Sequence, residues 1–347
     1  MVDCFAIENS LTIDTNGDIK PCCKYKGKFG NITTTDVNLQ NFLELKKNKN
    51  WPEGCSSCKY LEDNKIRSRR QTYLTRFNSE DFLLDLSIGN YCNLKCRMCN
   101  ETLSTNWYND AKKLGRILPK PFLLNNTQID KIFDYIPKNK SITIELKGGE
   151  PLVTPNIQYL FEKAFKLNAK IICITNGTEL PNWFLEKLNY MDIQLQMSID
   201  GIKNTYNYVR GDKNFDWERC AERMSYLESL DIDFSYNYVV QNLTVNDMLD
   251  FENLTTKRIN WIILNNPSYL ICNNIPDENK NNILEKINKI KTCPSGIKEL
   301  INKPCDLEVY KKFIEETKKL DKIRNQNLKN VLPHLLNSQG EYMYDTI

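Results

Sequence analysis

From residue 81 onward, short apolar runs alternate with segments of helical periodicity, and this alternation constrains the fold more than any other feature. We expect strands at 82–88, 141–146, 170–175, 192–198, 232–240 and 259–264. We expect helices between them near 101–118, 127–136, 156–167, 181–189, 215–230 and 244–254. Such alternation predicts a parallel sheet covered by helices. Six units are too few for a closed barrel of roughly 250 residues, so we predict an α/β fold with a partial (β/α)6 TIM-like barrel.

Three cysteines follow the first of these expected strands. Cys92, Cys96 and Cys99 form a C-x₃-C-x₂-C loop. Three thiolates on one short loop can bind a cluster of soft metal ions. A four-iron cluster usually takes four thiolates, so three of them would leave one iron open to a further ligand.

Further polar and glycine residues fall at the ends of the later strands. In chain order they are Gly148, Gly149, Glu150, Asn176, Ser198, Asp200 and Arg210. Each short motif alone could be an ordinary turn. The carboxyl ends of parallel strands meet at one edge of a sheet, where ligands bind. Two glycines would let backbone approach a ligand closely, and the carboxylate of Glu150 could hold an ammonium group.

The first 80 residues form a cysteine-rich segment. Residues 5–7 and 10–13 are short strand-like pieces, and a turn at 14–18 indicates a possible hairpin, after which residues 19–21 lead back to Cys22. Residues 38–49 have the pattern of an amphipathic helix. The segment contains a set of four thiols, Cys4, Cys22, Cys55 and Cys58. Their spacing alone favours a zinc ribbon over an iron–sulfur site. Cys23 could replace Cys22, and only one of the two is expected to serve because consecutive extended side chains point to opposite faces.

The totals restrict the class of protein. A chain of 347 residues suits about two domains, and thirteen cysteines without a signal-peptide pattern indicate metal or redox chemistry. The mild net charge of +3 argues against nucleic-acid binding, and no apolar run approaches the roughly 18 residues of a membrane span. We therefore expect a cytoplasmic protein. His334 is the single histidine, so we expect no histidine-based mechanism and a packing or surface role for that residue.

Residues 82–265 resemble the radical S-adenosylmethionine (SAM) superfamily on the strength of these motifs. The resemblance implies that Cys92, Cys96 and Cys99 hold a 4Fe–4S cluster whose open iron binds SAM. It also implies that the Gly148–Glu150 segment binds the SAM amine. The resemblance also implies that Asn176, Ser198 and Arg210 contact the ribose or the methionine carboxylate, and Asp200 lies in the same segment as Ser198. Met98, at a position where an aromatic residue is common, would contact the adenine, and so would the backbone around Val240.

The N-terminal segment resembles the twitch/SPASM domain of the same superfamily. This implies a second, auxiliary 4Fe–4S cluster with four ligands, Cys4, Cys22, Cys55 and Cys58, in place of zinc. The family normally carries this domain after the barrel, whereas here it comes first. We expect three parts: the auxiliary-cluster domain and linker at 1–80, the barrel at 81–275, and a helical C-terminal extension at 276–347.

The resemblance implies reductive cleavage of SAM to a 5′-deoxyadenosyl radical that removes hydrogen from a substrate C–H bond. An auxiliary cluster ligated by four cysteines favours an electron-acceptor role, and therefore oxidation or cross-linking. The implied substrate is a peptide or protein side chain, or a small molecule. The implied partner is a one-electron reductant of the flavodoxin or ferredoxin type. The alternative is a non-catalytic iron–sulfur or zinc protein that binds partners or transfers electrons.

Overall fold

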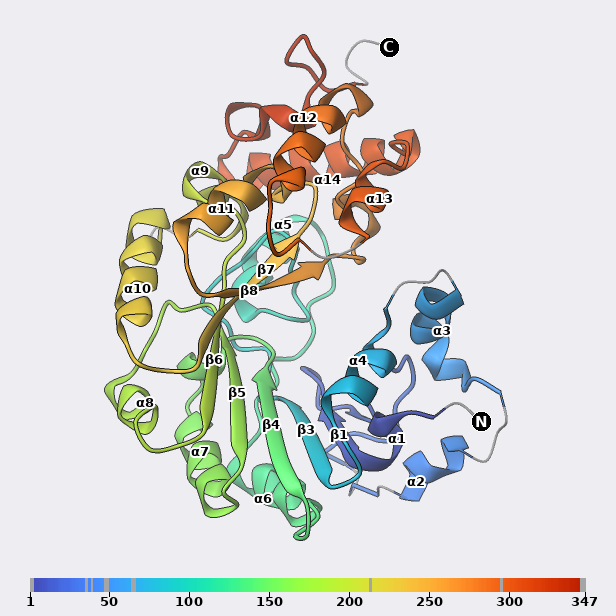
Figure 1. Cartoon of the computed structure of the whole chain (residues 1–347), viewed down its shortest axis with the longest axis vertical. Helices are drawn as coiled ribbons and strands as arrows, with labels where there is room; N and C mark the ends of the chain where they lie inside the picture. The colour runs from blue at the N-terminus through green and yellow to red at the C-terminus, as the bar shows by residue number, and fades with distance from the viewer. Residues whose placement is uncertain are drawn as a thin grey trace.

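One mixed sheet organises the chain (Figure 1). The computed structural model describes residues 3–34, 37–38, 40–46, 50–63, 67–211, 214–293 and 296–343. Within them the sheet has eight strands in the order β2-β1-β3-β4-β5-β6-β7-β8. The strands are β1 Ser10–Ile13, β2 Ile19–Lys20, β3 Asp81–Ser87, β4 Ser141–Lys147, β5 Lys170–Thr175, β6 Ile193–Ser198, β7 Phe234–Val240 and β8 Arg258–Ile263.

The six strands β3 to β8 are parallel neighbours, which confirms the predicted partial barrel. Helices connect them as expected: α5 Tyr108–Lys113, α6 Asn126–Asp134, α7 Ile157–Lys166, α8 Asn182–Lys187, α10 Trp217–Ser229 and α11 Met248–Leu254. The sheet order is linear, so the barrel stays open and β8 is an edge strand. One helix of this region was not expected, α9 Lys203–Val209.

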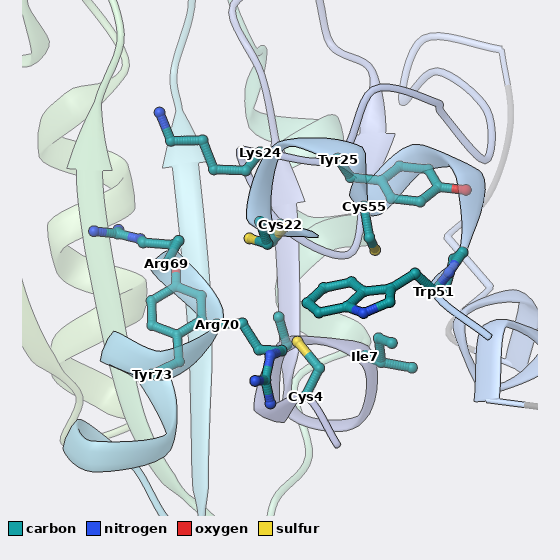
Figure 2. A pocket seen from close by; sticks show the side chains of 13 residues that line it. Cys4, Ile7, Cys22, Lys24, Tyr25, Trp51, Cys55, Arg69, Arg70 and Tyr73 are labelled. Atoms are coloured by element: carbon teal, nitrogen blue, oxygen red, sulfur yellow. The ribbon is translucent and has the colours of Figure 1, made fainter. Parts of the chain in front are cut away.

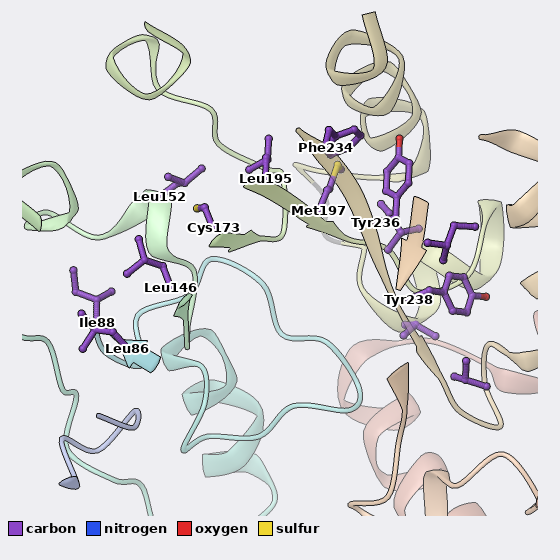
Figure 3. Packing of buried hydrophobic residues seen from close by; sticks show 14 of the residues in the cluster. Leu86, Ile88, Leu146, Leu152, Cys173, Leu195, Met197, Phe234, Tyr236 and Tyr238 are labelled. Carbon is purple, nitrogen blue, oxygen red and sulfur yellow. The ribbon is translucent and has the colours of Figure 1, made fainter. Parts of the chain in front are cut away.

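Apolar side chains of neighbouring strands form the core in register (Figure 3). Leu86, Leu146, Cys173 and Leu195 lie opposite one another across β3, β4, β5 and β6, and all four are fully buried. Side chains alternate between the two faces of a strand. The preceding residues in β3 and β4, Asp85 and Glu145, therefore point to the other face, which we call the inner face. The sheet thus packs its apolar face against the helices and keeps polar groups on the inner face.

The N-terminal segment extends this sheet. The expected hairpin forms between β1 and β2, and the carboxylate of Asp14 accepts hydrogen bonds from the backbone N–H groups of Asn16 and Asp18 in its turn. The expected strand at 5–7 is wrong, because Phe5–Asn9 forms the helix α1, with Cys4 as its N-cap. β1 pairs in parallel with β3, so the segment adds two strands to the edge of the barrel sheet.

The described residues of this segment form three further α-helices. They are α2 Gln40–Leu43, α3 Ser56–Asp63 and α4 Arg69–Arg76. α2 continues as a 3₁₀ turn at Glu44–Lys46. Of the helix expected at 38–49, Asn38 is not helical, and positions 39 and 47–49 lie outside the described residues. Ser68 and Gln71 form a capping box that fixes the start of α4. Tyr73 of α4 packs with Leu83 of β3, so α4 lies against the inner face.

The C-terminal extension is helical, as expected. It contains α12 Asp277–Asn288, α13 Ile297–Ile301 and α14 Leu307–Arg324. Figure 1 shows these helices beyond the carboxyl ends of the strands. Asp306 caps α14 by accepting hydrogen bonds from two backbone N–H groups. Among the described residues, no helix combines the length and the apolar character that crossing a membrane requires.

Candidate functional site

The cysteine loop and the glycine motif meet just beyond β3 and β4. Glu150 donates its backbone N–H to the carbonyl oxygen of Tyr91 over 2.7 Å, directly before Cys92. A Cβ atom on Gly149 would lie 2.0 Å from that same oxygen, and Gly149 has a φ of +35°. Only glycine fits so close a backbone approach. The two motifs therefore form one rigid unit.

The pKa of Cys96 is shifted down, whereas those of Cys92 and Cys99 are shifted up. Burial raises the pKa of Cys92 to about 12. The thiol of Cys99 hydrogen-bonds to Cys96 and lowers the pKa of Cys96 to about 7, and the nearby guanidinium of Arg210 acts in the same direction. A thiolate that forms near neutral pH is the form that binds metal. The donor set therefore fits a soft metal cluster.

The carboxylate of Glu150 is held by backbone and side chain. It accepts hydrogen bonds from the hydroxyl of Thr175 and the backbone N–H of Asn176, both at 2.6 Å, and from the N–H of Leu152 at 3.2 Å. Burial raises its pKa to about 7 despite these bonds. A buried carboxylate is stabilised when a cation pairs with it. The site therefore fits an ammonium group.

Asn176 joins the loop after β5 to the cysteine loop. Its Nδ2 donates to Oδ1 of Asn93 over 2.9 Å, and Asn93 in turn donates to the hydroxyl of Thr178 over 2.7 Å. The sequence motifs identified Asn176 but missed Asn93 and Thr178. Asn93 directly follows Cys92 and Thr178 lies two residues after Asn176, and this closeness to motif positions is the signal that could have found them.

Asp200 and Arg210 form a buried ion pair beside the thiols. Asp200 also accepts a hydrogen bond from the backbone N–H of Val239 over 2.7 Å, which ties the pair to β7. Nε of Arg210 is buried and has no hydrogen-bond partner among the described residues. A buried donor without a partner costs about 1–3 kcal/mol, so this atom fits a bound acceptor such as a carboxylate.

Three other residues that were expected to contact the cofactor differ in how deeply they are buried. Ser198 is the last residue of β6 and is partly exposed. Met98 is partly buried against the core. The side chain of Val240 is fully buried in the core, so only its backbone remains to face a ligand. Their roles toward SAM stay predictions.

The N-terminal thiols surround one cavity (Figure 2). Cys4, Cys22, Cys55 and Cys58 all line it, together with apolar groups such as Trp51. Burial raises the pKa of Cys4, and it raises the pKa of Cys55 to about 11. Neighbouring thiols raise both pKa values further. Such thiols become thiolates when a metal binds, because the metal supplies the missing positive charge.

Cys23 does not line this cavity. Its thiol interacts instead with Arg69 and Lys147 on the inner face of the sheet. The structure thus places Cys22 among the other three thiols. His334 is also not near them: Nε2 hydrogen-bonds to the carbonyl oxygen of Asn242, in keeping with a packing role.

No three His, Cys, Asp or Glu side chains of the described residues converge on a single metal ion. The ligands of a four-iron cluster bind separate iron atoms, so they need not converge on one point. The carboxylates near the thiols are already engaged in hydrogen bonds or ion pairs.

Comparison with known families agrees with these two sites. Residues 86–254 match the model of the Radical SAM superfamily. Residues 4–59 match the model named SPASM, an iron–sulfur cluster-binding domain, which here precedes the barrel. This description agrees with the auxiliary iron–sulfur cluster that the resemblance implied for the N-terminal thiols, and not with the zinc ribbon that their spacing alone favoured.

Individual relatives are distant. The chain is 29% identical over 170 residues to an S-adenosylmethionine-dependent nucleotide dehydratase of Flammeovirga pacifica, covering 47% of this chain and 55% of that protein. It is 27% identical over 129 residues to the sporulation killing factor maturation protein SkfB of Bacillus subtilis, covering 37% and 28%. The chain thus spans about half, or less, of these relatives. The structure of Streptococcus suis SuiB bound to S-adenosylmethionine aligns with a TM-score of 0.45 at 13% identity, over 80% of this chain and 68% of that one.

Proposed function

We propose that the chain is a radical SAM enzyme that cleaves SAM reductively, because the model of that superfamily matches residues 86–254. The observation that carries the proposal is the single unit formed by the cysteine loop and the Gly-Gly-Glu segment, joined at Tyr91. When bound, the cluster and SAM would supply a 5′-deoxyadenosyl radical that removes hydrogen from a substrate C–H bond. The protein's own part is to bind, orient and exclude water.

The residues around this unit would hold SAM by its polar groups. Cys92, Cys96 and Cys99 would ligate the cluster. Glu150 would pair with the ammonium group, and Nε of Arg210 would donate to a carboxylate or ribose oxygen. Asn176, Ser198, Met98 and the backbone at Val240 would complete the contacts, and Asp200 would hold Arg210 in place.

For the N-terminal cavity we propose an auxiliary 4Fe–4S cluster ligated by Cys4, Cys22, Cys55 and Cys58. With four protein ligands it has no open iron for substrate, so an electron-acceptor role fits best. That role favours net oxidation or cross-linking over a redox-neutral rearrangement. We also propose that residues 1–80, 81–275 and 276–347 act as the auxiliary, barrel and C-terminal parts.

The proposed substrate is a peptide or protein side chain, with a small molecule as the second candidate. SkfB is by name a maturation protein for a killing factor, and the dehydratase acts by name on a nucleotide. The short matches to both leave the substrate class to experiment. A flavodoxin or ferredoxin would deliver the electron. A non-catalytic iron–sulfur or zinc protein is the alternative.

Anaerobic incubation of the reconstituted protein with dithionite and SAM tests the enzyme proposal. We expect 5′-deoxyadenosine to form, and to disappear when Cys96 is replaced by alanine. Cys272→Ala is the matched control, because Cys272 is a fully buried core residue whose charged neighbour is Lys280, a residue of neither site. A wild-type protein that retains iron and releases no 5′-deoxyadenosine would refute the proposal and favour the non-catalytic alternative.

Iron analysis tests the auxiliary site separately. Cys22→Ser is expected to lose about half of the bound iron and one of two EPR signals after reduction, because one of two clusters cannot assemble. Cys23→Ser is the neighbouring control and should keep both signals, since Cys23 does not line the cavity. Bound zinc, or a single reducible cluster in the wild type, would contradict the second cluster.

A further inference from the structure

A charged cluster lies on the inner face between the two cysteine sites. The ammonium group of Lys147 lies 2.6 Å from the carboxylate of Asp85 and 3.6 Å from that of Glu145. Arg69 reaches from α4 to Glu145, with 3.0 Å between Nη2 and Oε1. Asp85 is fully buried and Glu145 nearly so. Two cations and two anions thus compensate one another inside the protein.

Four buried polar atoms in and beside this cluster have no hydrogen-bond partner among the described residues. They are Oγ1 of Thr12, the hydroxyl of Tyr73, Nε of Arg69 and Oδ1 of Asp85, whose other carboxylate oxygen accepts from Lys147. The side chains of Thr12 and Tyr73 are each only 1% exposed. Thr12 lies opposite Asp85 in the sheet register, and Arg69 stacks over the Tyr73 ring at 4.7 Å. Each such atom costs about 1–3 kcal/mol, so four in one place indicate a ligand site.

The position of these atoms connects the two cysteine sites. Arg69 and Tyr73 line the cavity of the N-terminal thiols. Figure 2 shows the Arg69 guanidinium directed away from those thiols, toward the strands of the sheet. On the other side, Lys147 directly precedes the glycine motif that joins the cysteine loop. A ligand at this place would lie between the proposed SAM site and the proposed auxiliary cluster.

The chemistry of the side chains around this site indicates which kind of ligand it can bind. The ionic groups are paired with each other, so they leave no excess charge for an ionic ligand to neutralise. The unpaired atoms are a donor, two hydroxyl groups that can donate or accept, and one carboxylate oxygen that accepts. Further along the inner face, β6 to β8 present hydrogen-bonded amides, where Asn237 donates to Gln196 over 3.0 Å and Asn260 donates to Asn237 over 2.9 Å. Such surroundings suit an uncharged group that has both a carbonyl oxygen and an N–H.

We propose that Thr12, Arg69 and Tyr73 form a subsite that anchors an amide group of the substrate. The carbonyl oxygen accepts from Nε of Arg69, and the N–H donates to the hydroxyl oxygen of Thr12 or Tyr73. The ion pairs of Asp85, Glu145 and Lys147 keep Arg69 in position. This inference rests on the proposed function, because it assigns the inner face to substrate, and it selects a peptide amide over a polyol or a nucleotide phosphate.

Binding of an uncharged amide tests the subsite. The probe is N-acetylglycine methylamide, titrated by saturation-transfer NMR against the protein loaded with clusters and SAM, with glucose and Mg–CTP as comparison ligands. We expect saturable binding of the amide only. Thr12→Val and Tyr73→Phe should each weaken it about two- to tenfold, the effect of one neutral hydrogen bond.

Thermal unfolding of the probe-free protein separates a binding role from a structural one. Thr12→Val and Tyr73→Phe keep the shape and remove an unpaired hydroxyl, so Tm should stay or rise. The matched control is Tyr310→Phe, whose buried hydroxyl donates to the carbonyl oxygen of Leu335. That variant should lower Tm and leave amide binding unchanged.

Several results would overturn the subsite. They are absence of amide binding, equal binding by the variants, preferred binding of glucose or Mg–CTP, or a fall in Tm for Thr12→Val and Tyr73→Phe like that of the control. Formation of 5′-deoxyadenosine by the same wild-type preparation is measured in parallel. Its absence counts against the proposed enzyme, whereas the amide titration judges the subsite on its own.

Discussion

Replacing Asp321 by alanine is expected to release the cysteine loop from the C-terminal helix α14. Arg97 lies between Cys96 and Met98, and its buried guanidinium pairs with Asp321. Asp321 also accepts hydrogen bonds from the Tyr208 hydroxyl and the backbone N–H of Leu328, both at 2.8 Å. Arg97 and Asp321 are 5% and 7% exposed. One carboxylate thus connects the cysteine loop, α9 and the C-terminal segment.

The expected loss of stability follows from the burial of this ion pair. Removing one partner of a buried pair leaves an uncompensated charge and costs about 3–5 kcal/mol. A typical domain is stable by only about 5–15 kcal/mol, so Asp321→Ala should lower Tm clearly and loosen the cysteine loop first. The double variant Arg97→Met with Asp321→Leu removes both charges and should recover much of the stability, because no charge stays buried alone.

EPR and iron analysis after anaerobic reconstitution provide the assay. We expect Asp321→Ala to lose the signal of the barrel cluster and to keep that of the N-terminal cluster, which serves as an internal reference. Glu315→Ala is the control, because Glu315 lies exposed on the same helix. Full retention of both signals with a wild-type Tm would refute the idea that α14 holds the loop.

Three further outcomes follow from the site. Gly149→Ala should abolish SAM binding, measured by equilibrium dialysis, because its Cβ would clash with a backbone oxygen, whereas Gly115→Ala, also at positive φ but with open space around it, should bind normally. SAM affinity should rise as pH increases through about 7, since Glu150 must lose its proton to pair with the ammonium group; a flat profile from pH 6 to 8 would contradict that role. Burial lowers the pKa of His334 to about 4, below its usual value near 6.5, so the stability from keeping this residue neutral is lost as pH falls through that window. His334→Gln should therefore flatten the pH dependence of Tm between 6.5 and 4.

The sequence was sufficient to predict the strands, because their pattern is local. The strands of the barrel appear within one or two residues of their expected ends, because apolar runs of strand length are read directly from neighbouring residues. Helix α9 was missed because its sequence, Lys203–Val209, is rich in Asn, Thr and Tyr, which are weak helix formers. Its residues Thr205, Tyr206, Tyr208 and Val209 are buried, so packing imposes the helix.

The N-terminal segment shows structure that the local sequence pattern could not predict. Residues 5–7 read as a strand from their apolar character but form α1, which packs Phe5 and Ala6 against Tyr73 of α4. Nothing in the sequence indicated that β1 would join β3, since strand pairing depends on backbone hydrogen bonds between segments about seventy residues apart.

The sequence by itself determined the order of the parallel strands and the motifs at their carboxyl ends, because spacing and periodicity are properties of short segments. It also supplied the four N-terminal thiols but left Cys22 and Cys23 open. Only the tertiary structure placed Cys22 in the cavity and Cys23 on the inner face. Only the tertiary structure brought Asp321 to Arg97 across 224 positions. Such pairs form where folded elements meet, and a charge or hydroxyl becomes informative only once burial has removed its water.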